Sequence, residues 1–276
     1  MINSFNIFGI SIHFYSLCIL LGIIVAYIVI RLEGHDQRLN KDYIFNVVFY
    51  GLIIGILGAR LHYVLFNLDY YLSYPSEIIK IWHGGLAIHG GIIAAAIFVY
   101  FYSTKVQKTS FLRSLDVILP GVIIAQAIGR WGNFFNQEAY GIVVSKGLLQ
   151  KLLIPNFVIK GMYIDGAYHL PTFYIESILC LIGFIIILLI RNHRNVRVGY
   201  VTAFYLIWYG IIRFIIELFR TDSLMLFNIK IACVISVIFI LLGVWLFYYT
   251  TYKKNLRYRR TMLWHFHIRL KKKYLN

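Results

Sequence analysis

Acidic residues and cysteines are scarce in this sequence. Asp and Glu together make up 11 of the 276 residues, against 27 Lys and Arg, and there are three cysteines. Cys18, Cys180 and Cys233 each lie inside an apolar stretch, and no two of them have the spacing of a zinc knuckle or a CxxC redox motif. Buried cysteines of this kind act as small hydrophobic residues. The pattern argues against a disulfide framework, and the sequence predicts no metal site.

Charge is missing altogether from three long stretches. Residues 1–30, 81–104 and 231–252 contain no Asp, Glu, Lys or Arg. The whole chain is 60% hydrophobic and 14% charged, whereas a soluble domain has about 45–50% apolar and about 25% charged residues. A helix that crosses a bilayer needs about 20 mostly apolar residues. The sequence therefore predicts an all-α integral membrane protein.

Hydrophobic blocks between charged residues predict the number of spans. Seven transmembrane helices are expected, near residues 13–31, 43–66, 85–103, 115–132, 173–190, 198–219 and 230–252. Together they make a transmembrane domain over residues 1–252. Residues 134–172 are too long for a simple turn and predict an extracytoplasmic cap between the fourth and fifth spans. Residues 253–276 predict a basic cytoplasmic tail.

The distribution of basic residues predicts the orientation. Segments 31–42, 104–114, 191–197 and 253–276 hold 18 Lys and Arg, whereas the connections on the opposite side hold six. Cytoplasmic loops carry the excess of positive charge, so the N-terminus is expected outside and the C-terminus in the cytoplasm. The net charge of +16 is concentrated in the tail. Such a tail favours attraction to an anionic lipid bilayer over binding to nucleic acid.

Several ionisable or polar residues are predicted to lie within the membrane, where a charged side chain costs at least about 2.5–3.5 kcal/mol. In the predicted orientation all of them lie toward the outer leaflet. They are Tyr15, Arg60, His62, His89, Arg130, Arg213 and Glu217, with Arg220 at the exit of its span. The arginines gather beneath the face whose loops hold few basic residues. Because topology does not explain them, we expect a ligand.

The sixth predicted span contains the sequence RFIIELFR. Arg213, Glu217 and Arg220 are spaced i, i+4 and i+7 and so share one stripe of a helix. One interpretation is an intrahelical ion pair with an interfacial arginine that reaches the headgroups. The other is a cation that Glu217 holds in place for an anionic ligand. Arginine suits a phosphate because its planar guanidinium bonds bidentately and stays charged.

The sequence GRWGNFFNQEAYG, residues 129–141, ends the fourth predicted span. Helical spacing aligns Arg130, Asn133 and Asn136, and Glu138 follows. Glycine and asparagine at a helix end can satisfy the last carbonyls, but this does not explain Arg130 or Glu138. A second stretch, HGGLAIHGG, contains His89. Its glycines are explained by close helix packing, whereas His89 is either a structural residue or part of the same site.

These residues resemble the prolipoprotein diacylglyceryl transferase family. GRWGNFFNQEAYG matches the family signature of Gly-Arg, Gly-Asn-Phe, Asn, Glu and a final glycine, here Gly141. IWHGGLAIHGG, GARLHYVLF, IRFIIELFRTD and HFYSLCILLG are also similar, in the same order over nearly the whole chain. One stretch departs: in HLPTFYIESI, Leu170 and Ile175 stand where the family usually has His and Tyr.

The resemblance implies an enzyme of the bacterial cytoplasmic membrane whose active site faces outward. It would transfer the diacylglyceryl group of phosphatidylglycerol to the lipobox cysteine of a prolipoprotein, forming a thioether and releasing glycerol phosphate. Its partners would be phosphatidylglycerol, lipobox peptides and the lipid bilayer, and it would need no cofactor. The alternative is a transporter or lipid-binding scaffold that uses the same arginines only to hold an anionic headgroup.

The resemblance and the residue types together suggest roles. Arg130 and Arg213 would stabilise the departing phosphate, with Arg60 a weaker third, because fixed cations favour the transition state. His89 would be the general base for the thiol, with Glu138 or a water as the competing candidate. Glu217 would hold Arg213. The predicted substrate-binding residues are Tyr15, Arg60, Arg130, Asn133, Asn136, Glu138, Gly141, Glu217 and Arg220.

Overall fold

The protein is mostly helical. The structure, a computed structural model, describes residues 4–7, 10–193, 196–222, 225–226 and 229–252, so the predicted basic tail lies outside the described residues. Six helices in this part are long and apolar enough to cross a membrane. They are α1 (Phe14–Asp36), α2 (Lys41–Leu65), α5 (Phe111–Asn136), α8 (Thr172–Asn192), α9 (Tyr200–Phe219) and α10 (Ile231–Tyr252). The prediction of an all-α membrane protein is confirmed.

The predicted third span, residues 85–103, corresponds to a shorter helix. α4 covers Ile88–Phe101, which is 14 residues. At 1.5 Å per residue it is about 21 Å long, less than the roughly 30 Å of a bilayer core. A single π-helical segment, η3 (Tyr102–Val106), continues it. Length and composition therefore identify six spans in the described residues, and the seventh stays a prediction.

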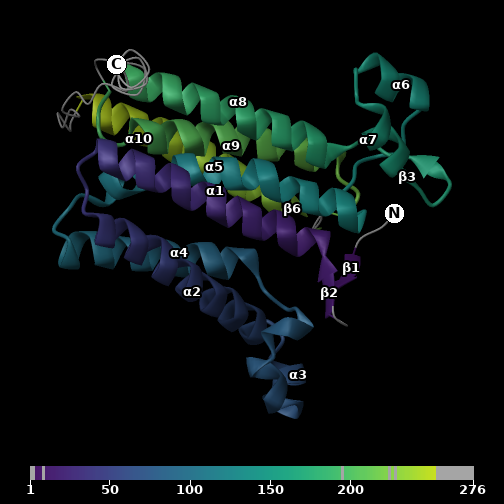
Figure 1. Cartoon of the computed structure of the whole chain (residues 1–276), viewed down its shortest axis with the longest axis horizontal. Coiled ribbons are helices and arrows are strands. Elements are labelled where there is room, and N and C mark those ends of the chain that lie inside the picture. The colour runs from purple at the N-terminus through teal and green to yellow at the C-terminus, as the bar shows by residue number, and fades with distance from the viewer. Residues whose placement is uncertain (1–3, 8–9, 194–195, 223–224, 227–228, 253–276) are drawn as a thin grey trace, which may run out of the picture. The chain divides into compact units, whose positions relative to one another are not determined.

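The chain divides into two compact units, residues 1–30 with 116–276 and residues 31–115. In the first unit, α5, α8, α9 and α10 run side by side (Figure 1). Glycines bring α9 and α10 close together, because a Cβ on Gly210 would lie 2.9 Å from the Ser236 carbonyl oxygen. A Cβ on Gly243 would likewise lie 2.9 Å from the carbonyl oxygen of Ala203. Small residues at such contacts are typical of helix packing in membranes.

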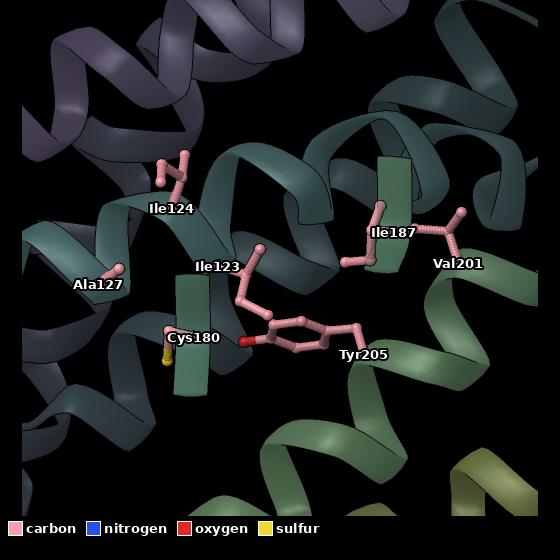
Figure 2. Packing of buried hydrophobic residues seen from close by; sticks show 7 residues of the cluster. All are labelled: Ile123, Ile124, Ala127, Cys180, Ile187, Val201 and Tyr205. Atoms are coloured by element: carbon pink, nitrogen blue, oxygen red, sulfur yellow. The ribbon is translucent and has the colours of Figure 1, made fainter. Parts of the chain in front are cut away.

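Apolar side chains from α5, α8 and α9 form the core of the first unit. Figure 2 shows this cluster, in which Tyr205 of α9 lies beside Ile123 of α5. Cys180 is completely buried there, and all three cysteines are free, in agreement with their apolar surroundings in the sequence. The Tyr205 hydroxyl accepts a hydrogen bond from Gln126 Nε2 at 3.0 Å, which satisfies a polar group inside the core. The cluster fixes the three helices that carry the buried charges described below.

A fully buried aspartate joins the beginnings of α5 and α9. Asp116 Oδ2 accepts from the Gly199 backbone N–H at 2.6 Å, and Oδ1 accepts from the Thr202 N–H at 2.8 Å and its hydroxyl at 2.6 Å. These bonds satisfy N–H groups that a helix start leaves unpaired. Arg130 lies 14 residues after Asp116, and Arg213 lies 14 residues after Gly199. The shared anchor therefore places both arginines about 21 Å along their helices.

A cap connects α5 to α8, and we use this name for residues 137–171. It contains α6 (Lys146–Lys151), α7 (Asn156–Gly161) and the antiparallel pair β3 (Tyr163–Ile164) and β4 (Ala167–Tyr168). α6, α7 and β3 lie beyond the ends of α5 and α8 (Figure 1). The cap has its own apolar core, which includes Phe134 of α5 and Phe173 of α8. The cap is therefore fixed to the ends of both helices.

Two further hairpins belong to the first unit. β1 (Ser4–Ile7) pairs with β2 (Ile10–His13) just before α1. β5 (Met225–Leu226) pairs with β6 (Ile229–Lys230) just before α10. Lys230 Nζ donates to the carbonyl oxygens of Glu217 at 2.6 Å and Arg220 at 3.0 Å. It therefore neutralises the carbonyl end of α9, where a cation is favourable.

The second unit is built on α2 and α4. Glycines again allow the contact, because a Cβ on Gly58 would lie 2.8 Å from the Gly90 carbonyl oxygen. The connection between the two helices contains α3 (Leu68–Ser73), η1 (Pro75–Ile79) and η2 (Ile81–His83). Its last residues are paired with α2, since the Ala87 N–H donates to the Ala59 carbonyl at 3.0 Å.

Candidate active site

Two arginines from different helices meet at one buried carboxylate. Nη2 of Arg130, on α5, lies 2.6 Å from Oε1 of Glu176, on α8. Nη1 of Arg213, on α9, lies 3.8 Å from Oε2 of the same carboxylate. The Glu176 side chain is only 2% exposed, whereas those of Arg130 and Arg213 are 20% and 19% exposed. The carboxylate is thus enclosed, and the guanidinium groups remain partly accessible.

Glu217 completes the cluster. Its Oε2 lies 2.6 Å from Arg213 Nη2, at the i, i+4 spacing seen in the sequence. Two cations and two carboxylates therefore balance each other, and buried charges need such partners. The hydroxyl of Tyr209, also on α9, hydrogen-bonds with Arg130. We call Arg130, Glu176, Arg213 and Glu217 the charge cluster.

The charge cluster keeps unused hydrogen-bonding capacity. Within the described residues, Arg213 Nη1 is buried and has no hydrogen-bond partner, and its ion pair with Glu176 is too long for a hydrogen bond. Buried donors without partners are rare and call for an explanation. Because Nη1 is itself buried, an anion would supply its acceptor only by entering the charge cluster.

Tyr15 joins the start of α1 to the end of α5. A Cβ on Gly132 would lie 2.7 Å from Tyr15 Cδ2, so only glycine allows the ring to lie this close. Tyr15 also interacts electrostatically with Glu138 and Arg130. Asn133 Nδ2 donates to Glu138 Oε1 at 2.9 Å, and the Glu138 N–H donates to the Asn133 carbonyl at 3.0 Å. The predicted residues Tyr15, Asn133 and Glu138 therefore share one end of α5 with Arg130.

Gly141 lies where the cap returns toward the helices. Its N–H donates to the Leu170 carbonyl at 2.9 Å, and it forms an antiparallel bridge with Arg220. A Cβ here would lie 3.0 Å from the Leu170 Cβ and from the Thr172 Cγ2, which is tighter than usual. The family pattern has a histidine where this chain has Leu170, and this chain has His169 one position earlier. The Nδ1 of His169 donates to the Gly141 carbonyl at 3.0 Å, so this side chain supports the backbone of Gly141.

Arg220 and Asn136 lie at the ends of their helices. Arg220 Nε donates to Asp222 Oδ1 and Arg220 Nη2 donates to Asp222 Oδ2, both at 2.9 Å. Burial by itself would raise the pKa of Asp222, but the hydrogen bonds and charge of Arg220 outweigh it and hold this pKa below its usual value. Asn136 is the last residue of α5 and is exposed. Arg220 is thus held by a neighbouring carboxylate, and Asn136 is open to solvent or ligand.

Arg60 belongs to the second unit and is almost buried, with 6% exposure. Its Nε donates to the Ile78 carbonyl at 2.9 Å, and Nη1 donates to the carbonyls of Gly84 at 2.6 Å and Gly85 at 2.9 Å. Nη2 donates to the carbonyls of Glu77 at 2.5 Å and Lys80 at 3.4 Å. Each nitrogen of the guanidinium therefore binds carbonyls of residues 77–85, in the connection between α2 and α4.

The connection that Arg60 binds also carries a small ionic network. Glu77 Oε1 lies 2.7 Å from Lys80 Nζ, and Oε2 lies 2.7 Å from His83 Nδ1. The hydrogen bonds with Lys80 and His83 lower the pKa of Glu77. His89 is the second residue of α4, in this same unit, and is exposed. The connection that Arg60 holds therefore leads directly into the helix that carries His89.

Glu176 was not among the predicted site residues. It is the only ionisable carboxylate in the predicted span 173–190, and the cost of placing a charge in the membrane is a signal that would have identified it. Its partners lie on other helices, so no local spacing pairs it with them.

Among the described residues, no group of three or more His, Cys, Asp and Glu is arranged to hold a metal ion.

Known proteins resemble this chain over most of its length. A family model described as prolipoprotein diacylglyceryl transferase matches residues 3–249. The phosphatidylglycerol–prolipoprotein diacylglyceryl transferase of Staphylococcus aureus strain MSSA476 is 44% identical over 253 residues, which cover 91% of this chain and 90% of the relative. The protein of the same name from Staphylococcus aureus strain JH9 has the same identity and coverage. The chain therefore belongs to the prolipoprotein diacylglyceryl transferase family.

Proposed function

We propose that the charge cluster is the active site at which this diacylglyceryl transferase moves the diacylglyceryl group of phosphatidylglycerol onto the lipobox cysteine of a prolipoprotein. The observation that carries the proposal is the meeting of Arg130 and Arg213 at Glu176. Two guanidinium groups held by one enclosed carboxylate form a rigid receptor for a phosphate. Preorganised cations of this kind need no rearrangement as charge develops.

In the proposed reaction, the cysteine sulfur attacks a glycerol carbon of phosphatidylglycerol. A C–S bond forms while the C–O bond to the phosphate breaks, and glycerol phosphate leaves with the electron pair. Negative charge grows on the phosphate oxygens, so Arg130 and Arg213 bind the transition state more tightly than the substrate. Arg213 Nη1, which lacks a hydrogen-bond partner, is the donor we assign to a phosphate oxygen.

The thiol must lose its proton before or during the attack, and we propose His89 as the general base. Histidine is the side chain that most readily accepts and releases a proton at neutral pH, which suits it to this role. Glu138, which shares the end of α5 with Arg130, is the second candidate, and it would act directly or through a water. The two candidates are distinguished by substituting each in turn and measuring the transfer rate against pH. The base is the residue whose substitution removes the fall in rate on the acidic side of the profile.

The remaining residues position the substrates. Tyr15, Asn133 and Asn136 would bind the headgroup hydroxyls and phosphate oxygens, and Glu217 would hold Arg213. Gly141 would shape the entrance, and Arg220 would bind the headgroup from the end of α9. We propose that Arg60 acts mainly through the connection 77–85, because its guanidinium is bonded to carbonyls there.

We further propose the membrane arrangement in which this chemistry occurs. Seven spans with the N-terminus outside and the C-terminus in the cytoplasm would direct the charge cluster to the outer face of the cell membrane. The cap would then be extracytoplasmic and would bind the lipobox peptide beside Gly141. Residues 253–276 would lie in the cytoplasm against anionic lipid, and nucleic acid would not be a partner.

The decisive experiment measures thioether formation by mass spectrometry, with purified protein, labelled phosphatidylglycerol and a lipobox peptide. We expect Arg130→Ala to abolish transfer and Arg130→Lys to retain a small fraction, because lysine keeps the charge but not the planar guanidinium. Arg31→Gln is the matched control, because it removes an exposed arginine from a different helix, α1. Near-normal turnover of Arg130→Ala would disprove the assigned role. Lipid binding without transfer by the unchanged protein would indicate a lipid carrier instead.

A further inference from the structure

The cap exposes a group of large apolar residues although it lies outside every predicted span. We call residues 148–157 the cap elbow; they comprise the end of α6, the connection 152–155 and the first two residues of α7. Leu152 is 52% exposed, Leu153 is 87% exposed and Phe157 is 56% exposed. In the same segment Leu149 is fully buried in the cap core and Ile154 is nearly so. The cap elbow therefore has one apolar side that the protein covers and a second that it leaves open.

The backbone of the cap elbow turns sharply at its most exposed residue. Leu153 has φ of +56°, in the left-handed region that residues with a Cβ disfavour. Its N–H donates to the Gln150 carbonyl at 3.0 Å, and the Ile154 N–H donates to the Leu149 carbonyl at 3.2 Å. Glycine or asparagine would fit this turn more easily. The turn instead presents a leucine to the surroundings, which points to an apolar partner.

The charge around the cap elbow indicates the kind of partner. The cap contains three lysines, Lys146, Lys151 and Lys160, whereas its acidic residues, Glu138 and Asp165, lie outside residues 139–164 that surround the cap elbow. Lys146 and Lys151 begin and end α6, and Lys160 lies in the last turn of α7. Apolar side chains between lysines are typical of segments that lie in the headgroup layer of an anionic membrane. An uncharged apolar peptide would make no use of the lysines.

The position of the cap fits this partner. Phe134 of α5 and Phe173 of α8 belong to the cap core, so the cap is fixed where two spanning helices end. Helix ends of this kind lie at the membrane surface. A second copy of the chain is a poorer partner for the cap elbow, because symmetric contact would bring lysines against lysines.

We propose that the cap elbow is a membrane anchor, in which Leu152, Leu153 and Phe157 insert into the headgroup layer of an anionic bilayer while Lys146, Lys151 and Lys160 bind lipid phosphates. Such segments enter the boundary between headgroups and acyl chains by roughly 5–10 Å. The anchor would hold the cap at a fixed height over the ends of α5 and α8. This inference does not depend on the chemistry proposed for the charge cluster.

Photo-crosslinking in the complete protein tests the anchor. Leu153 is replaced by benzoylphenylalanine, and the protein is reconstituted in vesicles of phosphatidylglycerol and phosphatidylcholine. The matched control carries the same probe at Asp165, an exposed residue in the turn between β3 and β4 of the same cap. After irradiation, mass spectrometry distinguishes lipid adducts from protein dimers. We expect several-fold more lipid adduct at position 153 than at position 165.

A second variant tests the lysines. Lys146→Gln, Lys151→Gln and Lys160→Gln are combined in the chain that carries the probe at position 153. The lipid adduct is expected to fall in phosphatidylglycerol vesicles and to change little in pure phosphatidylcholine vesicles, because only the first attracts cations. Equal lipid labelling at positions 153 and 165 would overturn the proposal. So would a predominant protein dimer, or an adduct that forms only after a lipobox peptide is added.

Discussion

Arg130 Nη2 lies 2.6 Å from Glu176 Oε1, and this contact joins α5 to α8 inside the membrane domain. The same carboxylate faces Arg213 on α9, so it sets the separation of the two arginines. Without a carboxylate between them, two like charges at this depth would repel each other strongly in a medium of low dielectric. Glu176 is therefore a positioning residue for both cations of the proposed active site.

The first prediction concerns Glu176→Gln. The amide keeps the shape of the side chain but leaves two arginines with only Glu217 as counter-ion. Because breaking a buried ion pair is strongly destabilising, we expect the free energy of unfolding to fall by about 3 kcal/mol. Transfer should fall by more than this loss of folded protein explains. Thermal unfolding and thioether formation, measured on the same preparation, check both parts.

Asp69→Asn serves as the control for this change, because Asp69 is exposed in α3. It should alter neither stability nor transfer. If Glu176→Gln behaved like this control, Glu176 would have no positioning role.

The second prediction concerns Arg213→Lys. Arg213 faces Glu217 through Nη2 and Glu176 through Nη1, whereas a lysine has a single nitrogen for both. We expect the ion pair with Glu217 to survive and the donor assigned to the phosphate to be lost. Removing one preorganised donor lowers kcat by about 10²-fold or more. Steady-state kinetics with phosphatidylglycerol should show this loss with a smaller change in KM.

The matched variant for Arg213→Lys is Arg31→Lys, at an exposed position on α1. An unchanged kcat in Arg213→Lys would mean that charge alone suffices and that the second nitrogen has no role in the transition state.

The third prediction separates two roles of Arg60. Arg60→Lys cannot replace donors that now serve the carbonyls of Glu77, Ile78, Gly84 and Gly85. An unsatisfied buried polar group costs about 1–3 kcal/mol, so we expect the free energy of unfolding to fall by at least about 2 kcal/mol. Unfolding measurements and hydrogen exchange of the segment 77–87 detect this loss. A stable variant with only a raised KM for phosphatidylglycerol would instead make Arg60 a direct ligand.

Spacing within one helix predicted the contacts of the site that form within that helix. The pair Arg213 and Glu217 follows from i, i+4 spacing on one helix, and the structure contains it. Glu176 lies 46 residues after Arg130, and this spacing does not predict that the two residues are in contact. Charge in an apolar span reveals that a residue needs a partner, but tertiary packing decides which partner it finds.

The same distinction holds for the fold. Apolar blocks predicted the helices that became α1, α2, α5, α8, α9 and α10. The block at 85–103 was predicted as a full span, yet α4 ends at Phe101 and continues only as a π-helical segment. Hydropathy measures how apolar a segment is and not where its helix begins. For Arg60 the sequence identified a buried cation, but not the backbone carbonyls that receive it.

The fourth prediction concerns Asp222 and the backbone contact between Gly141 of the cap and Arg220 at the end of α9. Arg220 binds Asp222 through two hydrogen bonds, and its backbone pairs with Gly141. The pKa of Asp222 is lowered in the folded protein. The pair therefore contributes its full stabilisation above the usual aspartate pKa of about 3.9, and loses it as the pH falls through the lowered value. The contribution of the Arg220–Asp222 pair should therefore stay constant between about pH 5 and 8.

Asp222→Asn removes this contribution at every pH. Because the Asp222 side chain is 48% exposed, solvent screening limits the loss to about 0.5 kcal/mol, or roughly a twofold change in an equilibrium. At neutral pH, hydrogen exchange of the segment 137–145 should accelerate about twofold in the variant, since Gly141 pairs with Arg220. Asp165→Asn, in the turn between β3 and β4, is the matched control within the cap. Identical exchange in both variants would show that the Arg220–Asp222 pair does not stabilise this contact.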